Sequence, residues 1–163
     1  MRFFRVFAFL AALVLPASAN AYDDPKALVT AIYAPYLSGQ QQQDDLNPFY
    51  SARLKQLFAE HAGQATASQM MASAGQAEAA AGIGFNPFID ADNALLLDLV
   101  IGEPAIIGEQ ALLTVSFHNF DHPSLLTLSM VREADGWKVD DVSSMGAGEH
   151  WMLSWLLQYD PWN

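Results

Sequence analysis

Two histidines and an aspartate lie close together in the second half of the chain and could bind a metal ion. His118 and His122 are four residues apart, with Asp121 between them. Imidazole nitrogens and carboxylate oxygens are ligands of zinc and copper. The spacing suits one face of a helix, but Pro123 follows and indicates a loop between strands. No third histidine stands at a suitable distance, so we expect no metal and no other cofactor. His118, His122 and Asp121 stay the candidates should a metal bind.

One acidic side chain interrupts an apolar segment near residue 100. Asp98 has a leucine on each side. In one interpretation its carboxylate points into a pocket from an apolar wall, where burial shifts a pKa toward the range of acid–base catalysis. In the other it pairs with a nearby cation or lies at a strand edge. We favour the structural interpretation and keep Asp98 among the candidate binding residues.

The C-terminus is rich in aromatic side chains. Trp151, Trp155 and Tyr159 follow one another at intervals of four residues, which places them on one face of a helix. We therefore expect a short amphipathic helix over residues 149–158. It could be a lid that closes the open end of the domain or an exposed aromatic anchor for a partner. With Trp137, these aromatic residues are our candidates for ligand or partner binding.

The composition excludes several classes of protein. The chain has no cysteine, which rules out a disulfide scaffold, a thiol enzyme and a cysteine zinc site. Its 163 residues include 18 acidic and 7 basic side chains, for a net charge of −11. Nucleic acids and anionic lipids are bound mainly by Lys and Arg, so we expect neither as a partner. The charge would suit a cationic partner, and it also fits a simple solvated acidic surface.

Residues 1–21 have the pattern of a cleavable export signal. Arg2 and Arg5 precede an apolar run over residues 6–15. That run is too short to span a bilayer, which takes about 20 residues. Small residues at Ala19 and Ala21 fit signal-peptidase cleavage. We expect a mature protein without a transmembrane segment, in the periplasm or outside the cell.

The chain after the signal begins with helical periodicity. Asp23 or Asp24 can cap a helix that has Pro25 in its first turn. Apolar residues recur there at helical spacing. Pro35 lies inside the pattern and predicts that the helix kinks or ends near Ala34.

Two further helices are expected before the strands. One opens at Asn47-Pro48, and a shorter one lies within residues 62–82, which are rich in Ala, Gln and Ser. The first of them has a shared face formed by Tyr50, Leu54, Leu57, Phe58 and His61.

From residue 95 onward the periodicity changes to two, which predicts β-strands. The alternating segments are residues 95–101, 105–108, 112–118, 126–131 and 137–140. We expect the first to be largely buried, and the Asp135-Gly136 turn to close a hairpin. Helices followed by antiparallel strands indicate an α+β fold, with the N-terminal helices packed on one face of a curved antiparallel sheet. This domain covers residues 22–145, and residues 146–163 form an aromatic C-terminal segment.

Strand alternation also predicts which side chains face the helices. The inner positions are all apolar: Leu113, Val115, Phe117, Leu126, Leu128, Met130, Trp137 and Val139. His118, Lys138 and Asp140 fall on the outer face. An interior without an acid or a base cannot perform general acid–base catalysis, although a bulge of one residue would invert part of this assignment.

Two motifs carry a resemblance to known families. Phe85-Asn-Pro-Phe-Ile-Asp-Ala-Asp92 precedes the first long strand, and Gly136-Trp-Lys-Val-Asp-Asp-Val142 ends the meander. Helices followed by such a meander resemble the cone-shaped NTF2-like and SnoaL-like class. The two motifs in this order are similar to a bacterial envelope family catalogued as domain of unknown function 3828. The resemblance covers about residues 24–145 and implies a cone fold and an envelope location, but no catalytic residues.

Three kinds of function are therefore open. We favour an exported, non-catalytic domain that binds a protein or an apolar small molecule through its mouth or its C-terminal segment. A SnoaL-like cavity enzyme, of isomerase or hydrolase type, is the second. An inhibitor or immunity protein for a basic target enzyme is the third, because the acidic charge would suit such a target.

Overall fold

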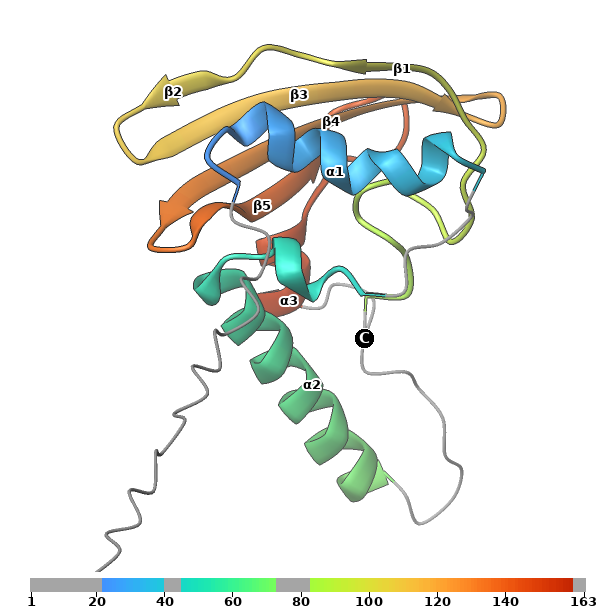
Figure 1. The fold of residues 1–163 in the computed structure, drawn as a ribbon. Helices are drawn as coiled ribbons and strands as arrows, with labels where there is room; N and C mark the ends of the chain where they lie inside the picture. Colours follow the sequence, from blue (N-terminus) through green and yellow to red (C-terminus); the bar gives the residue numbers. More distant parts are fainter. Residues whose placement is uncertain (1–21, 40–44, 73–82, 160–163) are drawn as a thin grey trace, which may run out of the picture.

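The computed structural model describes residues 22–39, 45–72 and 83–159, and the expected export signal lies outside them. The helices are α1 (Pro25–Leu37), the 3-10 turn η1 (Asn47–Phe49), α2 (Ala52–Ala72) and α3 (Leu153–Tyr159). The strands are β1 (Leu96–Ile101), β2 (Ala105–Ile107), β3 (Gln110–Asn119), β4 (His122–Glu133), β5 (Gly136–Ser144) and β6 (Trp151–Met152). They form one curved antiparallel sheet in the order β1-β3-β4-β5-β6, with β2 also paired to β3 (Figure 1). The predicted α+β class is confirmed.

Helix α1 lies across the sheet (Figure 1). Its N-cap is Asp24, whose carboxylate accepts a hydrogen bond from the backbone N–H of Ala27 at 2.9 Å. The helix continues through Pro35 to Leu37, so the alternative that it ends near Ala34 is wrong. Proline removes one backbone hydrogen bond. The burial of Tyr36 beyond it and the backbone bonds that close the helix at Ser38 offset this loss.

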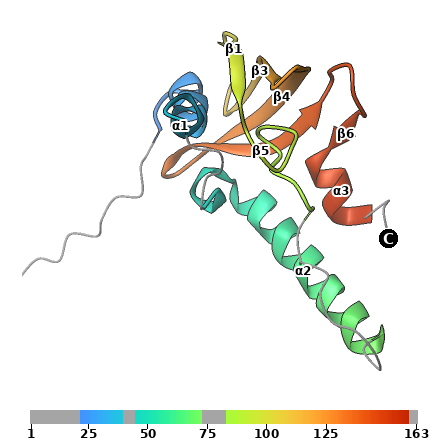
Figure 2. The ribbon, with the colours of Figure 1, turned by 90° about the vertical axis from the view of Figure 1, so that its right-hand side faces the viewer.

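The second predicted helix begins later and runs further than expected. Residues 47–49 form only a 3-10 turn, and Tyr50 is extended and pairs with Val139 of β5. Helix α2 then continues to Ala72, so the predicted separate helix within residues 62–82 is wrong as far as the structure describes this range. Figures 1 and 2 show α2 running away from the sheet, which leaves α1 as the N-terminal helix across its face. In the described residues, the remaining α-helix is the C-terminal α3. No helix in the described part of the chain is long and apolar enough to cross a membrane.

Strand β1 is an edge strand, and the expectation that it is largely buried is wrong. Leu97 and Val100 are 49% and 59% exposed. They pair with His118 and Ser116 of β3, which puts them on the outer face. A continuous apolar run resembles a strand covered on both faces, but no layer of the described chain covers this outer face.

The interior between α1 and the sheet is apolar. All eight positions predicted to face the helices are at most 3% exposed, so the inward alternation is confirmed. Helix α1 adds Leu28, Val29, Ile32 and Tyr33, all fully buried. Burial of this size is the main source of the fold's stability.

A bulge changes the alternation within β5. Met130 of β4 pairs with Val139, whereas Ser129 pairs with Asp141, so Asp140 is the extra residue. After it, Val142 and Ser144 are the buried residues. The buried side of β5 therefore changes from odd-numbered to even-numbered residues after residue 139.

Lys138, predicted to lie on the outer face of the sheet, is buried there by another segment of the chain. Its residue is only 3% exposed, because η1 lies against it. The ammonium group is 3.0 Å from the Asp135 carboxylate and donates a hydrogen bond to the Pro48 carbonyl at 3.3 Å. A buried ammonium needs such partners, since burying an unpaired charge costs several kcal/mol.

Candidate functional site

A pocket of about 770 Å³ lies between the segment that precedes β1 and the C-terminal segment. Both segments contribute apolar or aromatic walls, and the lining also includes two carboxylates and one imidazole. The lining residues are Ile83, Phe85, Asp90, Glu149, His150, Trp151, Trp155 and Leu156. The pocket therefore joins parts of the chain that are about 60 residues apart in the sequence.

Asp90 connects the two walls of this pocket. One carboxylate oxygen accepts a hydrogen bond from Trp151 Nε1 at 2.7 Å, and the other accepts one from Ser144 Oγ at 3.1 Å. The Phe85 ring packs against Trp151 nearly edge-on, with centroids 5.0 Å apart and an interplanar angle of 69°. These contacts set the position of the Trp151 ring in the pocket wall.

The Phe85–Asp92 motif is a compact turn. The backbone N–H of Asn86 donates to the carbonyl of Ala91 at 3.0 Å, and the Asn86 side chain accepts from the N–H of Phe88 at 2.9 Å. Phe88 and Ile89 are fully buried. Asp90 has a φ of 54°, a left-handed conformation that aspartate tolerates better than most residues. The turn therefore presents the Asp90 carboxylate to the pocket.

Two tyrosines of helix α1 fix the position of this turn through hydrogen bonds. Tyr33 donates a hydrogen bond to the Phe88 carbonyl at 2.7 Å, and the hydroxyl of Tyr36 accepts one from Asn86 Nδ2 at 2.6 Å. Burial raises the pKa of the Tyr33 hydroxyl, and burial also raises that of Tyr36. Both groups therefore stay neutral and act as structural hydrogen-bonding groups.

The predicted helix over residues 149–158 is only partly correct. Helix α3 begins at Leu153, because Trp151 and Met152 extend the sheet and pair with Ser144 and Ser143 of β5. Trp151 is therefore in a strand and partly buried. Trp155 and Tyr159 are on α3, with ring centroids 5.5 Å apart, and are 50% and 65% exposed.

Trp137 is not available to a ligand or a partner. It is 3% exposed and belongs to the main apolar core. Its backbone N–H donates to the Tyr22 carbonyl at 2.8 Å. Its ring has almost no accessible surface and is not among the described lining residues of the pockets.

The position of Asp98 fits the structural interpretation, in which it lies at a strand edge beside another charged or polar group. It lies in the irregular part of β1 between Leu97 and Val100, with a φ of 54°. Its side chain is 84% exposed, and its carboxylate is 3.6 Å from His118 Nδ1. It lies at a strand edge beside a group that can become cationic, and it does not line the pocket.

The candidate metal ligands do not converge. His122 pairs with Asn119, whereas His118 pairs with Pro123, so the two imidazoles start from opposite faces of the hairpin. Asp121 is at the hairpin turn, 90% exposed and 3.4 Å from His122 Nε2. Within the described residues no group of three His, Cys, Asp or Glu side chains could hold a metal ion.

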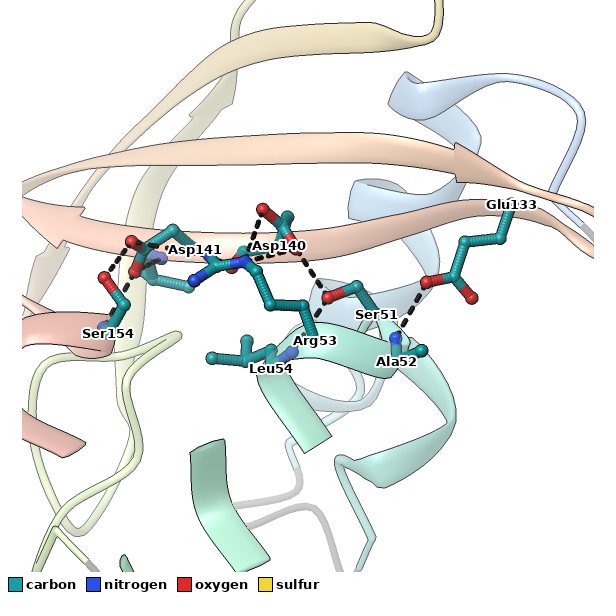
Figure 3. Close-up of polar contacts among 9 residues, drawn as sticks. Ser51, Ala52, Arg53, Leu54, Glu133, Asp140, Asp141 and Ser154 are labelled. Carbon is teal, nitrogen blue, oxygen red and sulfur yellow. Dashed lines mark hydrogen bonds and ion pairs between the residues drawn. The ribbon is translucent and has the colours of Figure 1, made fainter. Parts of the chain in front are cut away.

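A network of charged and polar groups surrounds the bulge in β5 (Figure 3). The Asp140 carboxylate accepts hydrogen bonds from Ser51 Oγ at 2.6 Å and from Arg53 Nε at 3.0 Å. Asp141 accepts from the backbone N–H and the hydroxyl of Ser154. Hydrogen bonding to Asp140 raises the pKa of Arg53.

This network attaches two helices to the sheet. Ser51 caps α2, since its Oγ accepts from the N–H of Leu54 at 3.0 Å, and Glu133 accepts from the N–H of Ala52 at 2.7 Å. Asp141 does the same for the first turn of α3 (Figure 3). Each carboxylate satisfies backbone donors that a helix N-terminus leaves unpaired. The network is therefore structural.

Asp90 also lines a second pocket, of about 530 Å³. Its walls come from residues 90–93 and from residues within 119–124 and 144–148, and they include both polar and apolar groups. The sequence shows the motif that contains Asp90. It does not show that Asp90 connects Ser144 and Trp151. No local signal identifies a partner 61 residues away.

Comparison with known proteins assigns no family: no family model matches the chain, and no curated protein or solved structure matches it. The similarity inferred from the two motifs therefore remains a prediction.

Proposed function

We propose that this chain is an exported, non-catalytic binding domain of the bacterial envelope, and that it takes a small ligand in the pocket between Phe85, Trp151 and Trp155. The pocket of about 770 Å³ is the observation that carries the proposal. Small-molecule sites in proteins usually have volumes of roughly 300–1,000 Å³, mainly apolar walls and a few polar groups. The lining of this pocket fits that description.

The walls have the properties of a prepared binding site. Trp151 is held by its hydrogen bond to Asp90 and by its contact with Phe85. Trp155 is half exposed at the pocket. A large aromatic surface left in water favours association with an apolar ligand. The fixed ring and the open ring together support binding of an apolar or aromatic body.

The polar groups of the pocket support binding more than catalysis. The titratable side chains among its described lining residues are Asp90, Glu149 and His150. In the described chain no hydrogen bond or ion pair joins any two of them: Asp90 is bonded to Trp151 and Ser144, and His150 Nε2 is 3.1 Å from the Gly146 carbonyl. General acid–base catalysis relies on groups positioned to exchange a proton with substrate and oriented by partners. An apolar binding role needs no such pair.

Binding can be tested with phenylnaphthylamine, a neutral dye whose fluorescence rises in apolar surroundings. We expect saturable binding to the wild-type protein and at least a fivefold loss of affinity in Trp155→Ala. Phe120→Ala is the matched control, because Phe120 is also an aromatic residue that is 50% exposed and does not line this pocket. Absence of saturable binding, or an equal loss in both variants, would contradict the proposal.

The envelope location rests on the sequence of residues 1–21 and on the resemblance of the two motifs. Export can be tested by mass spectrometry of the mature protein. We expect a chain that starts at Asn20 or Tyr22, found outside the cytoplasm. A chain that keeps Met1 would contradict this part of the proposal.

A further inference from the structure

We infer that the ligand of this pocket is a small organic cation, an ammonium group on an apolar body, and that Asp90 is its counter-ion. This inference rests on the proposed function and adds the chemical class of the ligand. It depends on the charges in the pocket wall and on the aromatic rings beside them.

Among the described residues, the negative charge of Asp90 has no cationic partner. Both carboxylate oxygens accept hydrogen bonds from neutral donors, Trp151 Nε1 and Ser144 Oγ. None of the ion pairs between described residues includes Asp90, although its residue is partly buried. A carboxylate in such a position attracts a cation more strongly than one in bulk water, because the local dielectric constant is lower.

The other described residues of the pocket add negative charge and no permanent positive charge. Glu149 provides a second carboxylate, and the described lining residues include neither Lys nor Arg. Asp140 and Asp135 differ from Asp90 in this respect, since Arg53 and Lys138 neutralise them. A positive charge to balance Asp90 can therefore come from the ligand. The net charge of −11 on the whole chain would also favour the approach of a cation.

The aromatic rings suit the same ligand. Phe85 and Trp151 meet nearly at a right angle, and Trp155 completes a lining of three aromatic side chains. The face of an aromatic ring attracts a cation, and Trp does so most strongly. Ile83 and Leu156 add apolar surface for the body of the ligand. An anionic ligand would be repelled by two carboxylates, and a neutral ligand would leave Asp90 without a counter-ion.

Three probes that share one apolar body separate these cases: phenylbutylamine, which is a cation at neutral pH, phenylbutanol, which is neutral, and phenylbutyrate, which is an anion. Each would compete with phenylnaphthylamine in the same assay. In the wild-type protein we expect the amine to bind about tenfold more tightly than the alcohol, and the carboxylate to bind most weakly.

Asp90→Asn tests the counter-ion directly. The amide keeps the size of the side chain and an oxygen that can accept from Trp151, but it removes the charge. We expect the amine to lose about tenfold in affinity while the alcohol binds as before. Asp121→Asn removes the same charge from an exposed turn outside this pocket and should leave the preference for the amine intact.

Each outcome decides between the two proposals. If amine and alcohol bind equally well to the wild-type protein, or if the preference survives in Asp90→Asn, the inference of a cationic ligand is wrong and the binding function stands. If neither the probes nor the dye bind, both are wrong. If Asp90→Asn does not fold, the wild-type comparison still decides, and Glu149→Gln, at an exposed position, should reduce the preference for the amine.

Discussion

The hydroxyl of Tyr33 donates a 2.7 Å hydrogen bond to the backbone carbonyl of Phe88, across 55 residues of sequence. Both residues are fully buried. The bond ties the helix that covers the sheet to the turn that carries Asp90. The position of the pocket thus depends on the core of the domain.

Tyr33→Phe removes this bond and leaves the Phe88 carbonyl buried without its partner. An unsatisfied buried acceptor costs about 1–3 kcal/mol, so we expect a fall of that size in the free energy of unfolding, measured with urea. Tyr159→Phe should change nothing, because Tyr159 is 65% exposed. An unchanged midpoint for Tyr33→Phe would show that the carbonyl finds another donor.

Substitutions of the two pocket tryptophans should separate stability from binding. Trp151→Ala removes a partly buried ring and its hydrogen bond to Asp90, and we expect it to cost about 2–3 kcal/mol. Trp155→Ala removes a ring that is 50% exposed and should cost about 1 kcal/mol. Urea unfolding of both variants measures the difference. A larger cost for Trp155→Ala would mean that α3 depends on this ring for its packing.

The buried ammonium of Lys138 predicts a pH-dependent effect of Asp135→Asn. Hydrogen bonding from Lys138 lowers the pKa of the Asp135 carboxyl below its ordinary value. The ionised carboxylate therefore stabilises the fold above the unfolded-state pKa of about 3.9, and this contribution is lost as the pH falls through the lower folded-state value.

At neutral pH Asp135→Asn should therefore be less stable than the wild type. The loss should be smaller than the cost of about 3–5 kcal/mol for breaking a fully buried pair, because Asp135 itself is 53% exposed. The two proteins should converge in strong acid, as followed by thermal unfolding over a range of pH. Asp121→Asn, at a side chain that is 90% exposed, serves as the control. A difference that persists in strong acid would rule out this origin.

Gly136→Ala should destabilise the start of the domain. Gly136 has a φ of 107°, and an added Cβ would lie 2.7 Å from the backbone N and O of Tyr22. We expect a loss of about 1–3 kcal/mol and faster hydrogen exchange at Trp137, whose N–H is bonded to Tyr22. Gly63→Ala, in α2 with open space around it, should instead stabilise the protein by up to about 1 kcal/mol.

Much of the fold follows from local patterns. The Asp24 cap and Pro25 start α1 as predicted, because a cap depends only on neighbouring residues. Alternation in β3 and β4 predicted their inner faces correctly, since successive side chains of a strand point to opposite sides. The sequence alone therefore predicts that the interior is apolar.

The candidate site depended on contacts that no local pattern contains. The extra residue Asp140 inverts the alternation in the second half of β5, and η1 covers Lys138. Trp151 is in a strand because its backbone pairs with Ser144 at the edge of β5. Asp90 lies in the pocket wall because the fold brings Ser144 and Trp151, which are more than 50 residues further along the chain, into hydrogen-bonding distance of it. Local periodicity is set by the geometry of adjacent residues, whereas these contacts arise only when distant segments pack together.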